Sequence, residues 1–420
     1  MKREVIIIGG GASGLFAAIM AADRGCRVTI LDANEKAGKK LLVTGNGRCN
    51  LSNMEKLNDK YYCNDQQFID LIFDRFSNMD VKTAFNRLGV ALKDKKGYIY
   101  PNSMQASTIS SALISACQIQ GVRIINNCTV TRVEVQKNGR FKINTLDNQT
   151  YSADRVLMAF GSRAGLKTDI PSYLLNSLKV LGHTIITPTP ALCSVFVKMQ
   201  DESYRCFFKN TGGVRSEIKA TLNIDGKPVK EYSGELQITE YGLSGIVIFQ
   251  LSRMISRTLL QNKQSEIYII IDFLPEYTTD EVLFMLKSQQ YYDKKSLLDL
   301  YSGLINQKLA LGLIHLFSEH MNPDIKPYMK QLPDDILRNS IDFIKHTPFL
   351  TDKTNDFIRA QVCSGGVDIS CINPVTLESK LVKNLYFSGE CMDVDGICGG
   401  YNLQWAWSTG YIAGRSLSND

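Results

Sequence analysis

The chain opens on an alternation of apolar strand and helix patterns. Val5 to Ile8 form a short run of β-branched residues, which is typical of a buried parallel strand. Residues 13–24 are rich in alanine and apolar side chains and predict a helix that Gly25 ends. A second apolar strand follows at 28–31 and is closed by Asp32. The pattern therefore predicts a β-α-β unit.

The glycine pattern G-x-G-x-x-G lies between the first strand and the helix. Gly9 allows a tight turn, Gly11 lets a diphosphate approach the backbone, and Gly14 lets the helix pack closely on the strand. The helix start then offers N–H groups to the diphosphate, and Asp32 can accept hydrogen bonds from adenosine ribose hydroxyls. The motif alone also fits a glycine turn that binds nothing. The strand, helix and acid around it favour a dinucleotide site.

The middle of the chain follows a different pattern. Short alternating apolar runs separated by turns predict antiparallel strands at 191–197, 214–224 and 234–239. A further strand-like run at 267–273 precedes helical periods with mixed charges at 279–286, 295–305 and 334–345.

These patterns predict one domain that is interrupted by another. We expect residues 1–189 and 356–420 to form the two parts of a dinucleotide-binding domain. We expect residues 190–355 to form an insert, with a β unit at 190–275 and a helical unit at 276–355. An insert in this position usually covers the reactive face of the cofactor and supplies the substrate wall.

Composition and charge narrow the function classes. Of the 420 residues, 44% are hydrophobic and 21% are charged, which is ordinary for a folded globular chain. The net charge of +6, from 48 basic and 42 acidic residues, is interspersed rather than gathered in a block. We therefore expect no nucleic-acid partner, since such proteins usually show a basic face.

The cysteines and the apolar runs bear on compartment. Eleven cysteines occur without a C-x-x-C pair, so no zinc or dithiol framework is present, and we expect no metal site and a cytoplasmic location. Gly9 to Gly11 interrupt the first apolar run, which argues against a signal peptide. No run approaches the roughly 20 apolar residues of a spanning helix, so we expect no membrane insertion.

Two regions bear on the choice between FAD and NAD. The stretch 38–50, GKKLLVTGNGRCN, has no helical or strand period and fits a loop that wraps a ligand, although a solvated surface loop would look similar. Near the other end, a strand at 385–388 is followed by several glycines and then by a last helix from Tyr401. Such a helix start could stabilise the negative charge of a reduced flavin, which NAD does not need. The alternative is a helix that only completes the fold.

At these residues a resemblance to a known family is clear. TGNGRCNLSN at 44–53, GELQITEYGLSG at 234–245, and SGGVDIS, TLESK and LYFSGECMDVDGICGGYNLQWAWSTG within 364–410 resemble the BaiN/aminoacetone-oxidase-like family of bacterial flavoproteins. The resemblance runs nearly end to end. It implies an α/β fold, with a three-layer, FAD-binding Rossmann-type domain split by an inserted β-barrel-like plus helical domain. It also implies non-covalent FAD and redox chemistry on a small or hydrophobic organic molecule.

The resemblance also assigns cofactor contacts to individual positions. These are Gly9, Gly11, Ala12, Ser13, Gly14, Asp32, Lys40, Thr44, Gly45, Gly47, Arg48, Asn50, Val130, Gly161, Gly389, Glu390, Asp393, Gly400, Tyr401, Asn402 and Leu403. The loop at 160–172 departs from the family pattern and is expected to be shorter. This loop usually lies over the cofactor near the substrate entrance, so its change bears on substrate identity.

The sequence shows no compact catalytic constellation. Four scattered histidines have no carboxylate or cysteine partner in a motif, and a structural role is the better interpretation for them. Arg48 is a candidate for holding a substrate anion or the reduced ring, or else a cofactor phosphate. Tyr241 lies in the TEYGLSG turn with Glu240 and Ser244, which could face the flavin or simply form a turn. Cys49 beside Arg48 is more simply inert than redox-active.

The main hypothesis is hydride transfer between flavin N5 and a small or hydrophobic organic substrate. Because only one dinucleotide fingerprint is present, the other redox partner is either O2 or an NAD(P)H that visits transiently. Two alternatives remain open, a flavoenzyme that acts on RNA and a non-catalytic flavin-binding module. We expect a small-molecule partner and a monomer or homodimer.

Overall fold

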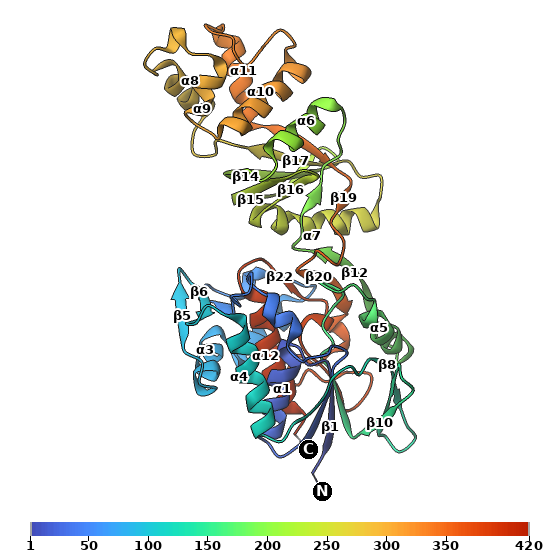
Figure 1. Ribbon diagram of the computed structural model, residues 1–420. Coiled ribbons are helices and arrows are strands. Elements are labelled where there is room, and N and C mark those ends of the chain that lie inside the picture. Colours follow the sequence, from blue (N-terminus) through green and yellow to red (C-terminus); the bar gives the residue numbers. More distant parts are fainter. Residues whose placement is uncertain (1, 419–420) are drawn as a thin grey trace. The chain divides into compact units, whose positions relative to one another are not determined.

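The computed structural model describes residues 2–418 and divides the chain into two compact units. The discontinuous unit runs up to Pro188 and resumes at Val362, and the insert unit comprises Thr189–Gln361 (Figure 1). Each unit has its own hydrophobic core. The two parts of the discontinuous unit therefore share one core although an entire unit separates them in the sequence.

A parallel sheet forms the centre of the discontinuous unit. Its order is β21-β11-β1-β2-β7, from β1 (Glu4–Ile8), β2 (Arg27–Leu31), β7 (Arg123–Ile125), β11 (Arg155–Met158) and β21 (Leu385–Phe387). Ile7 of the central strand pairs with Ile30 on one side and Leu157 on the other. β1 is apolar and buried because both faces of a central parallel strand are covered. The predicted α/β fold with a parallel sheet is confirmed.

Two further layers cover this sheet. Three helices lie on one side, namely α1 (Ala12–Ala22), α4 (Ala106–Ile119) and α12 (Tyr401–Ser416) (Figure 1). The antiparallel sheet on the other side contains β8 (Val130–Val135), β9 (Phe141–Thr145) and β10 (Thr150–Ala153). The remaining elements of the discontinuous unit are η1 (Lys39–Val43), β3 (Ser52–Asn53), η2 (Asn58–Lys60), β4 (Tyr61–Tyr62), α2 (Gln66–Arg75), α3 (Asn78–Arg87), β5 (Leu92–Lys95), β6 (Tyr98–Pro101), α5 (Ile170–Val180), β20 (Val362–Val367), η4 (Ile369–Cys371), η5 (Gly389–Cys391) and β22 (Asp395–Gly396). β12 (Ile185–Ala191) pairs with β20 where the chain passes between units.

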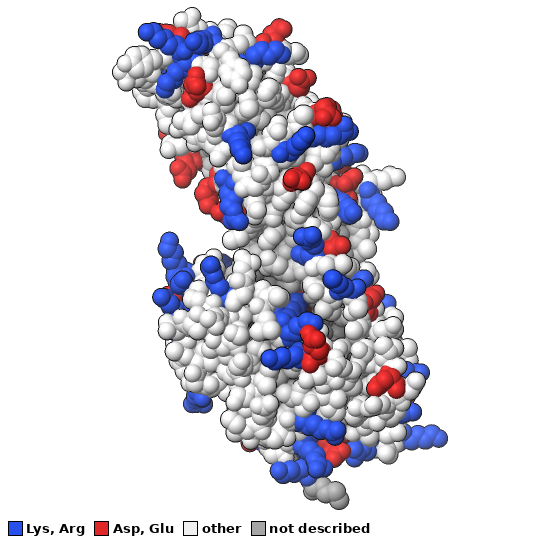
Figure 2. Space-filling view, viewed as in Figure 1, with Lys and Arg blue, Asp and Glu red and all other residues white. Residues whose placement is uncertain are grey.

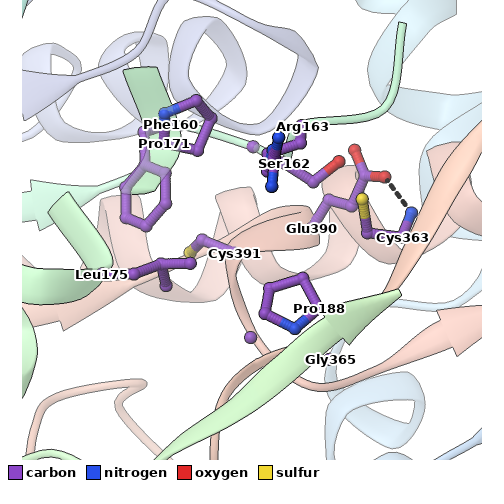
Figure 3. Close-up of a pocket in the computed structure, with 12 residues that line it drawn as sticks. Phe160, Ser162, Arg163, Pro171, Leu175, Pro188, Cys363, Gly365, Glu390 and Cys391 are labelled. Carbon is purple, nitrogen blue, oxygen red and sulfur yellow. Dashed lines mark hydrogen bonds between the residues drawn. The ribbon is translucent and has the colours of Figure 1, made fainter. Parts of the chain in front are cut away.

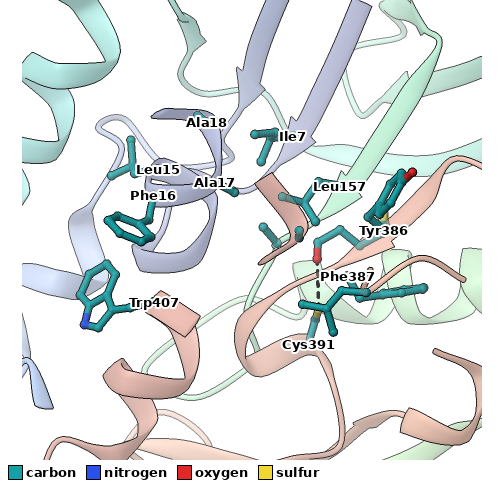
Figure 4. Packing of buried hydrophobic residues seen from close by; sticks show 14 of the residues in the cluster. Ile7, Leu15, Phe16, Ala17, Ala18, Leu157, Tyr386, Phe387, Cys391 and Trp407 are labelled. Carbon is teal, nitrogen blue, oxygen red and sulfur yellow. Dashed lines mark hydrogen bonds between the residues drawn. The ribbon is translucent and has the colours of Figure 1, made fainter. Parts of the chain in front are cut away.

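The first and last helices pack backbone against backbone. A Cβ added at Gly410 would lie 2.7 Å from the carbonyl oxygen of Ser13, and one at Gly414 would lie 2.5 Å from that of Ala17. Larger residues at these positions would therefore separate α1 from α12. The Phe16 and Trp407 rings meet edge to face beside this contact, 5.8 Å apart (Figure 4). The start of the chain is thus fixed to its end.

His183 is a buried neutral group in the discontinuous unit. Its Nε2 atom lies 2.7 Å from Ser379 Oγ, and its Nδ1 atom lies 3.2 Å from the Leu178 carbonyl oxygen. Ser379 Oγ already accepts hydrogen bonds from the N–H groups of Leu381 and Val382, so its own proton is free to donate to Nε2. The proton of a neutral His183 is then on Nδ1 and is donated to Leu178.

This arrangement predicts a pH-dependent stability. Burial lowers the pKa of His183, although the hydrogen bond to Leu178 opposes the shift. Below about pH 6.5 the unfolded chain binds a proton that the folded chain resists, so the free energy of unfolding should fall as the pH drops. Urea unfolding at about pH 7.5 and about pH 5.5 measures this, with His346→Gln as an exposed control. If His183→Gln keeps the full pH dependence, this assignment is wrong.

The insert unit is a curled antiparallel sheet with helices. The sheet order is β18-β17-β14-β15-β16-β13-β19. A backbone hydrogen bond of 2.8 Å from Lys198 N, just after β13, to Leu350 O of β18 brings the two ends of this order together. Its strands are β13 (Val195–Phe196), β14 (Arg215–Ile224), β15 (Lys227–Thr239), β16 (Gly242–Ser244), β17 (Ile267–Asp272), β18 (Thr347–Thr351) and β19 (Lys353–Thr354). Its helices are α6 (Glu202–Thr211), α7 (Ile246–Gln261), α8 (Thr279–Lys287), η3 (Tyr292–Lys294), α9 (Leu297–Ser302), α10 (Gln307–Met321) and α11 (Asp334–Lys345).

Helical content in this unit exceeds the prediction. The prediction that strands dominate 190–275 is wrong where α6 and α7 lie. The helix predicted at 295–305 is the shorter α9, and α10, which was not predicted, follows it. The predicted helices at 279–286 and 334–345 are confirmed as α8 and α11. Among residues 2–418, no helix has the length and apolar character to cross a membrane.

Candidate functional site

The predicted cofactor positions follow strands that end at one edge of the parallel sheet. Backbone hydrogen bonds join Gly9 N to Leu31 O (2.8 Å), Ala159 N to Ile8 O (2.9 Å) and Ser388 N to Met158 O (3.0 Å). The carboxyl ends of β2, β1, β11 and β21 therefore lie level with one another. Open α/β sheets bind their ligands at this edge.

The glycine loop at the end of β1 separates structural from ligand-facing positions. A Cβ at Gly14 would lie 2.0 Å from Gly9 O, and one at Gly9 would lie 2.3 Å from Ala159 O, so the fold itself requires both glycines. A Cβ at Gly11 would have no atom within 4 Å. Gly11 also precedes α1, whose first N–H groups no side chain caps among the described residues. The open space and the free donors fit an anionic diphosphate.

Asp32 orders the loop as well as facing the ligand edge. Its Oδ2 atom accepts from Gly10 N at 2.6 Å, and its Oδ1 atom accepts from Asn34 N at 2.7 Å and Nδ2 at 2.9 Å. A carboxylate offers about four acceptor sites, so one remains for a ribose hydroxyl. Cys128 N donates to Asp32 O at 2.8 Å, which brings the start of β8 and the predicted contact Val130 to the same edge.

The loop after η1 has an unusual backbone. Four of its residues, Gly45, Asn46, Gly47 and Cys49, have positive φ angles between 53° and 80°. Asn46 and Cys49 lack the freedom of glycine in this region, so the loop is held by its surroundings. The Oδ1 atom of Asn50 is buried and receives no hydrogen bond from the described residues. An acceptor without a donor fits a bound group that supplies one.

This loop and the following β3 are attached to the start of α12. Ser52 Oγ donates to Gln404 Oε1 (2.6 Å), and Trp407 Nε1 donates to Leu51 O (3.0 Å). Gly400, the residue before α12, would place a Cβ 2.9 Å from Asn50 Oδ1. The loop at 38–50 and the last helix therefore meet at Asn50 and Gly400.

The start of α12 offers its backbone rather than its side chains. The amide of Asn402 donates to and accepts from the backbone of Gly396, both at 2.8 Å. The hydroxyl of Tyr401, a buried residue, donates to Glu55 Oε2 at 3.2 Å. At these two positions and at Leu403, a contact to a ligand would use N–H groups, which no side chain caps among the described residues.

A pocket lies next to this edge, lined by the altered loop (Figure 3). Phe160, Gly161, Ser162 and Arg163 line it together with Glu390 and other residues of the discontinuous unit. Glu390 has two partners: its Oε2 atom accepts from Lys40 Nζ (2.8 Å), and its Oε1 atom accepts from Cys363 N (3.0 Å). The structure thus brings the predicted positions Lys40, Gly161 and Glu390 into one neighbourhood.

The remaining candidates have local partners. Tyr241 belongs to the insert unit, where its hydroxyl lies 3.1 Å from Ser194 Oγ and its ring packs on Phe196. Burial raises the pKa of the Cys49 thiol to about 11, so it stays protonated at neutral pH and the inert interpretation holds. His320 does have a carboxylate partner, Asp201, at 3.3 Å, which the sequence did not reveal.

The comparison with protein families decides the assignment. Residues 3–416 match the family model described as HI0933-like protein Rossmann domain. This chain belongs to the HI0933-like family of FAD-dependent oxidoreductases. The resemblance to BaiN-like flavoproteins is thereby confirmed, and the chain is a flavin oxidoreductase.

The chain is also similar over nearly its full length to proteins with named activities. The chain is 38% identical to the 3-dehydro-bile acid delta(4,6)-reductase of Clostridium scindens, over 99% of both chains. It is 29% identical to the ribosomal RNA dihydrouridine synthase of Haemophilus influenzae and 28% identical to that of Escherichia coli, each over 99% of this chain and 98% of the relative. These relatives thus carry names for quite different substrates.

The residues present fit the FAD of the HI0933-like family. The space and donors at Gly11 fit a diphosphate, the spare acceptor site of Asp32 fits a ribose hydroxyl, and the unpaired Asn50 oxygen fits a donor on the ligand. When bound, FAD supplies a site that accepts or donates a hydride.

Proposed function

We propose that this HI0933-like protein is a reductase that adds hydrogen across a ring C=C bond conjugated with a carbonyl group. A hydride would pass from N5 of the reduced, non-covalently bound flavin to the β-carbon, and a proton from solvent would reach the α-carbon. Both electrons would come from NAD(P)H, which leaves as NAD(P)⁺. NAD(P)H would visit transiently, because the chain contains one dinucleotide fingerprint.

The placement of two helix starts carries this proposal: Gly410 lies on Ser13 and Gly414 on Ala17, so α1 and α12 run in the same direction and the start of α12 extends beyond that of α1. A Cβ at Gly389 would lie 2.5 Å from Ser13 Oγ, so the turn after β21 touches the first turn of α1. The start of α1 would hold the diphosphate, while the start of α12, fixed by Asn50 and Ser52, would stabilise negative charge on the reduced ring. A binding module that lacks catalysis would not need the second of these.

Three further roles belong to the proposal. Asp32 would hold the adenosine ribose, and Arg48 would hold the substrate carbonyl or a nearby anion. Lys40 and Glu390 would form one wall beside the cofactor.

The relatives' names favour reduction over oxidation. One is a reductase of a bile acid with double bonds, and the others make dihydrouridine. Both products are ring compounds that have gained hydrogen. A small hydrophobic substrate is our first candidate, because the relative with 38% identity acts on a bile acid. RNA is the second candidate, favoured by a basic and aromatic face beside the site.

An anaerobic titration tests the proposal. The purified protein should be yellow, and NADH or NADPH should bleach its flavin absorbance. A 3-oxo-4,6-diene steroid acid or a uridine-containing RNA should then restore the colour without oxygen. A protein that does not take up FAD would overturn the proposal. So would a flavin that only oxygen reoxidises when both substrates are offered.

A further inference from the structure

The hairpin of β5 and β6 presents two tyrosines and two lysines on one face. Tyr98 and Tyr100 alternate with the buried Ile99, and their cross-strand partners are Lys95 and Lys93. Directly opposite residues in an antiparallel pair point to the same face. Both lysines are exposed, and Tyr98 is 40% exposed. Rings and charges are therefore paired across the strands.

Further positive charge surrounds these four residues. Lys96 is exposed at the turn of the hairpin, and Figure 2 shows basic side chains gathered over it. Arg48 lies close enough to act on Tyr100: burial raises the pKa of this tyrosine, and the charge of Arg48 opposes the shift. The acidic residue Asp94 accepts from Gly97 N at 2.8 Å and so closes the turn. We call Lys93, Lys95, Tyr98 and Tyr100, with Lys96 and Arg48, the hairpin face.

The hairpin face lies beside the candidate flavin site. Asn53 of β3 pairs with Tyr98, and its Nδ2 atom donates to Gly399 O at 3.2 Å, immediately before α12. Arg48 itself belongs to the loop at 38–50. A polymer held on the hairpin face would thus pass close to the start of α12. The sequence alone does not reveal this face, because the lysines and tyrosines become neighbours only when β5 and β6 pair.

We propose that the hairpin face binds single-stranded RNA. Bases would stack on Tyr98 and Tyr100, and Lys93, Lys95, Lys96 and Arg48 would contact phosphates. Stacking and regularly spaced cations together suit a flexible polyanion with planar rings, whereas a small monoanion would need only one of these cations. This inference concerns RNA, our second candidate substrate. It rests on the proposed function only in that the hairpin face lies beside the proposed flavin site.

Binding without turnover tests the inference on the FAD-loaded protein. The probe is a fluorescent oligouridylate of about 12 nucleotides, and its anisotropy is followed from about 50 to 200 mM salt. We expect Tyr98→Ala/Tyr100→Ala to weaken binding by about tenfold or more. Lys93→Gln/Lys95→Gln should reduce the salt slope by about 1.4. The varied side chains are at least partly exposed, and an unchanged flavin spectrum and melting temperature show that the variants fold.

A second hairpin supplies the matched control. Lys230 lies 5.5 Å from the ring centre of Tyr232 in β15, which is the same kind of basic and aromatic pair in the insert unit. Lys227→Gln/Lys230→Gln removes the same charge as Lys93→Gln/Lys95→Gln, but from a different hairpin. Binding should therefore stay within about twofold of the unaltered protein. Equal losses in both pairs of variants would overturn the inference. So would equal affinity for oligodeoxythymidylate, or a preference for phosphatidylserine vesicles.

The two proposals fail separately. RNA binding with a flavin that neither NADH nor NADPH reduces would reject the proposed reductase and retain the hairpin face. A reducible flavin on a protein that shows no salt-dependent RNA binding would reject the hairpin face and leave the reductase with its small-molecule substrate.

Discussion

Gly11→Val is expected to give a folded protein that has lost its FAD. The position tolerates a side chain, because a Cβ there has no atom within 4 Å and the φ angle of −81° is ordinary. The same space is where the diphosphate would meet the first N–H groups of α1. We expect an FAD affinity at least about 100-fold weaker, or about 2.7 kcal/mol, measured by titrating the apoprotein with FAD.

Two further substitutions make this result interpretable. Gly303→Ala in the insert unit is the control, since Gly303 also has a negative φ and a Cβ there would lie 3.5 Å from Leu300 O, so FAD binding should not change. Gly14→Val should instead damage the fold, because its Cβ would lie 2.0 Å from Gly9 O. Native FAD affinity in a folded Gly11→Val protein would show that the diphosphate binds elsewhere.

The β-α-β unit could be predicted because its signals are local. The strand at Val5 to Ile8 is apolar on both faces, and Gly14 is required by its close contact with Gly9, five residues before it. Gly9, by contrast, is required from far along the chain, by Ala159 after β11. Asp32 ends the second strand for the same local reason. Spacing along the chain is enough to infer such features, since the backbone itself imposes them.

The partners of the site residues could not be predicted. Lys40 and Glu390 form an ion pair although 350 positions separate them, and nothing in either local sequence indicates the pairing. Asn402 was expected to touch the cofactor, yet its amide is used by the backbone of Gly396. Such contacts depend on the register of packed elements, which a single sequence does not encode locally.

The insert shows where periodicity misleads. α7 begins with Ile246, Val247 and Ile248, which are β-branched and follow two strands, so the local propensity indicates a strand. Its helical period emerges only further on, at the buried Leu251 and Ile255. Packing of this face overrode the propensity of the first turn. α11 was predicted correctly because its apolar and charged residues alternate with a helical period throughout.

Lys345→Met is expected to produce the largest loss of stability in the insert unit. The side chain of Lys345 is 10% exposed, and its Nζ atom donates to Asp272 Oδ2 (2.7 Å), Leu274 O (2.8 Å) and Tyr277 O (2.6 Å). Methionine fills similar space but leaves a largely buried carboxylate and two carbonyls without this donor. Breaking such a pair costs about 3–5 kcal/mol, and the melting transition of the insert should fall by roughly 10 °C.

Two further variants test whether the loss of stability comes from the buried ion pair or from the removal of any lysine charge. Lys287→Met removes an exposed pair with Asp334 in the same unit and should cost at most about 1 kcal/mol. Lys345→Met/Asp272→Leu should recover most of the loss, because the stranded carboxylate is gone. If Lys345→Met costs no more than Lys287→Met in calorimetry, the ammonium does not hold α11 to β17. Since α11 leads directly into β18 at the edge of the curled sheet, a loosened α11 should also expose that strand to proteolysis before the discontinuous unit unfolds.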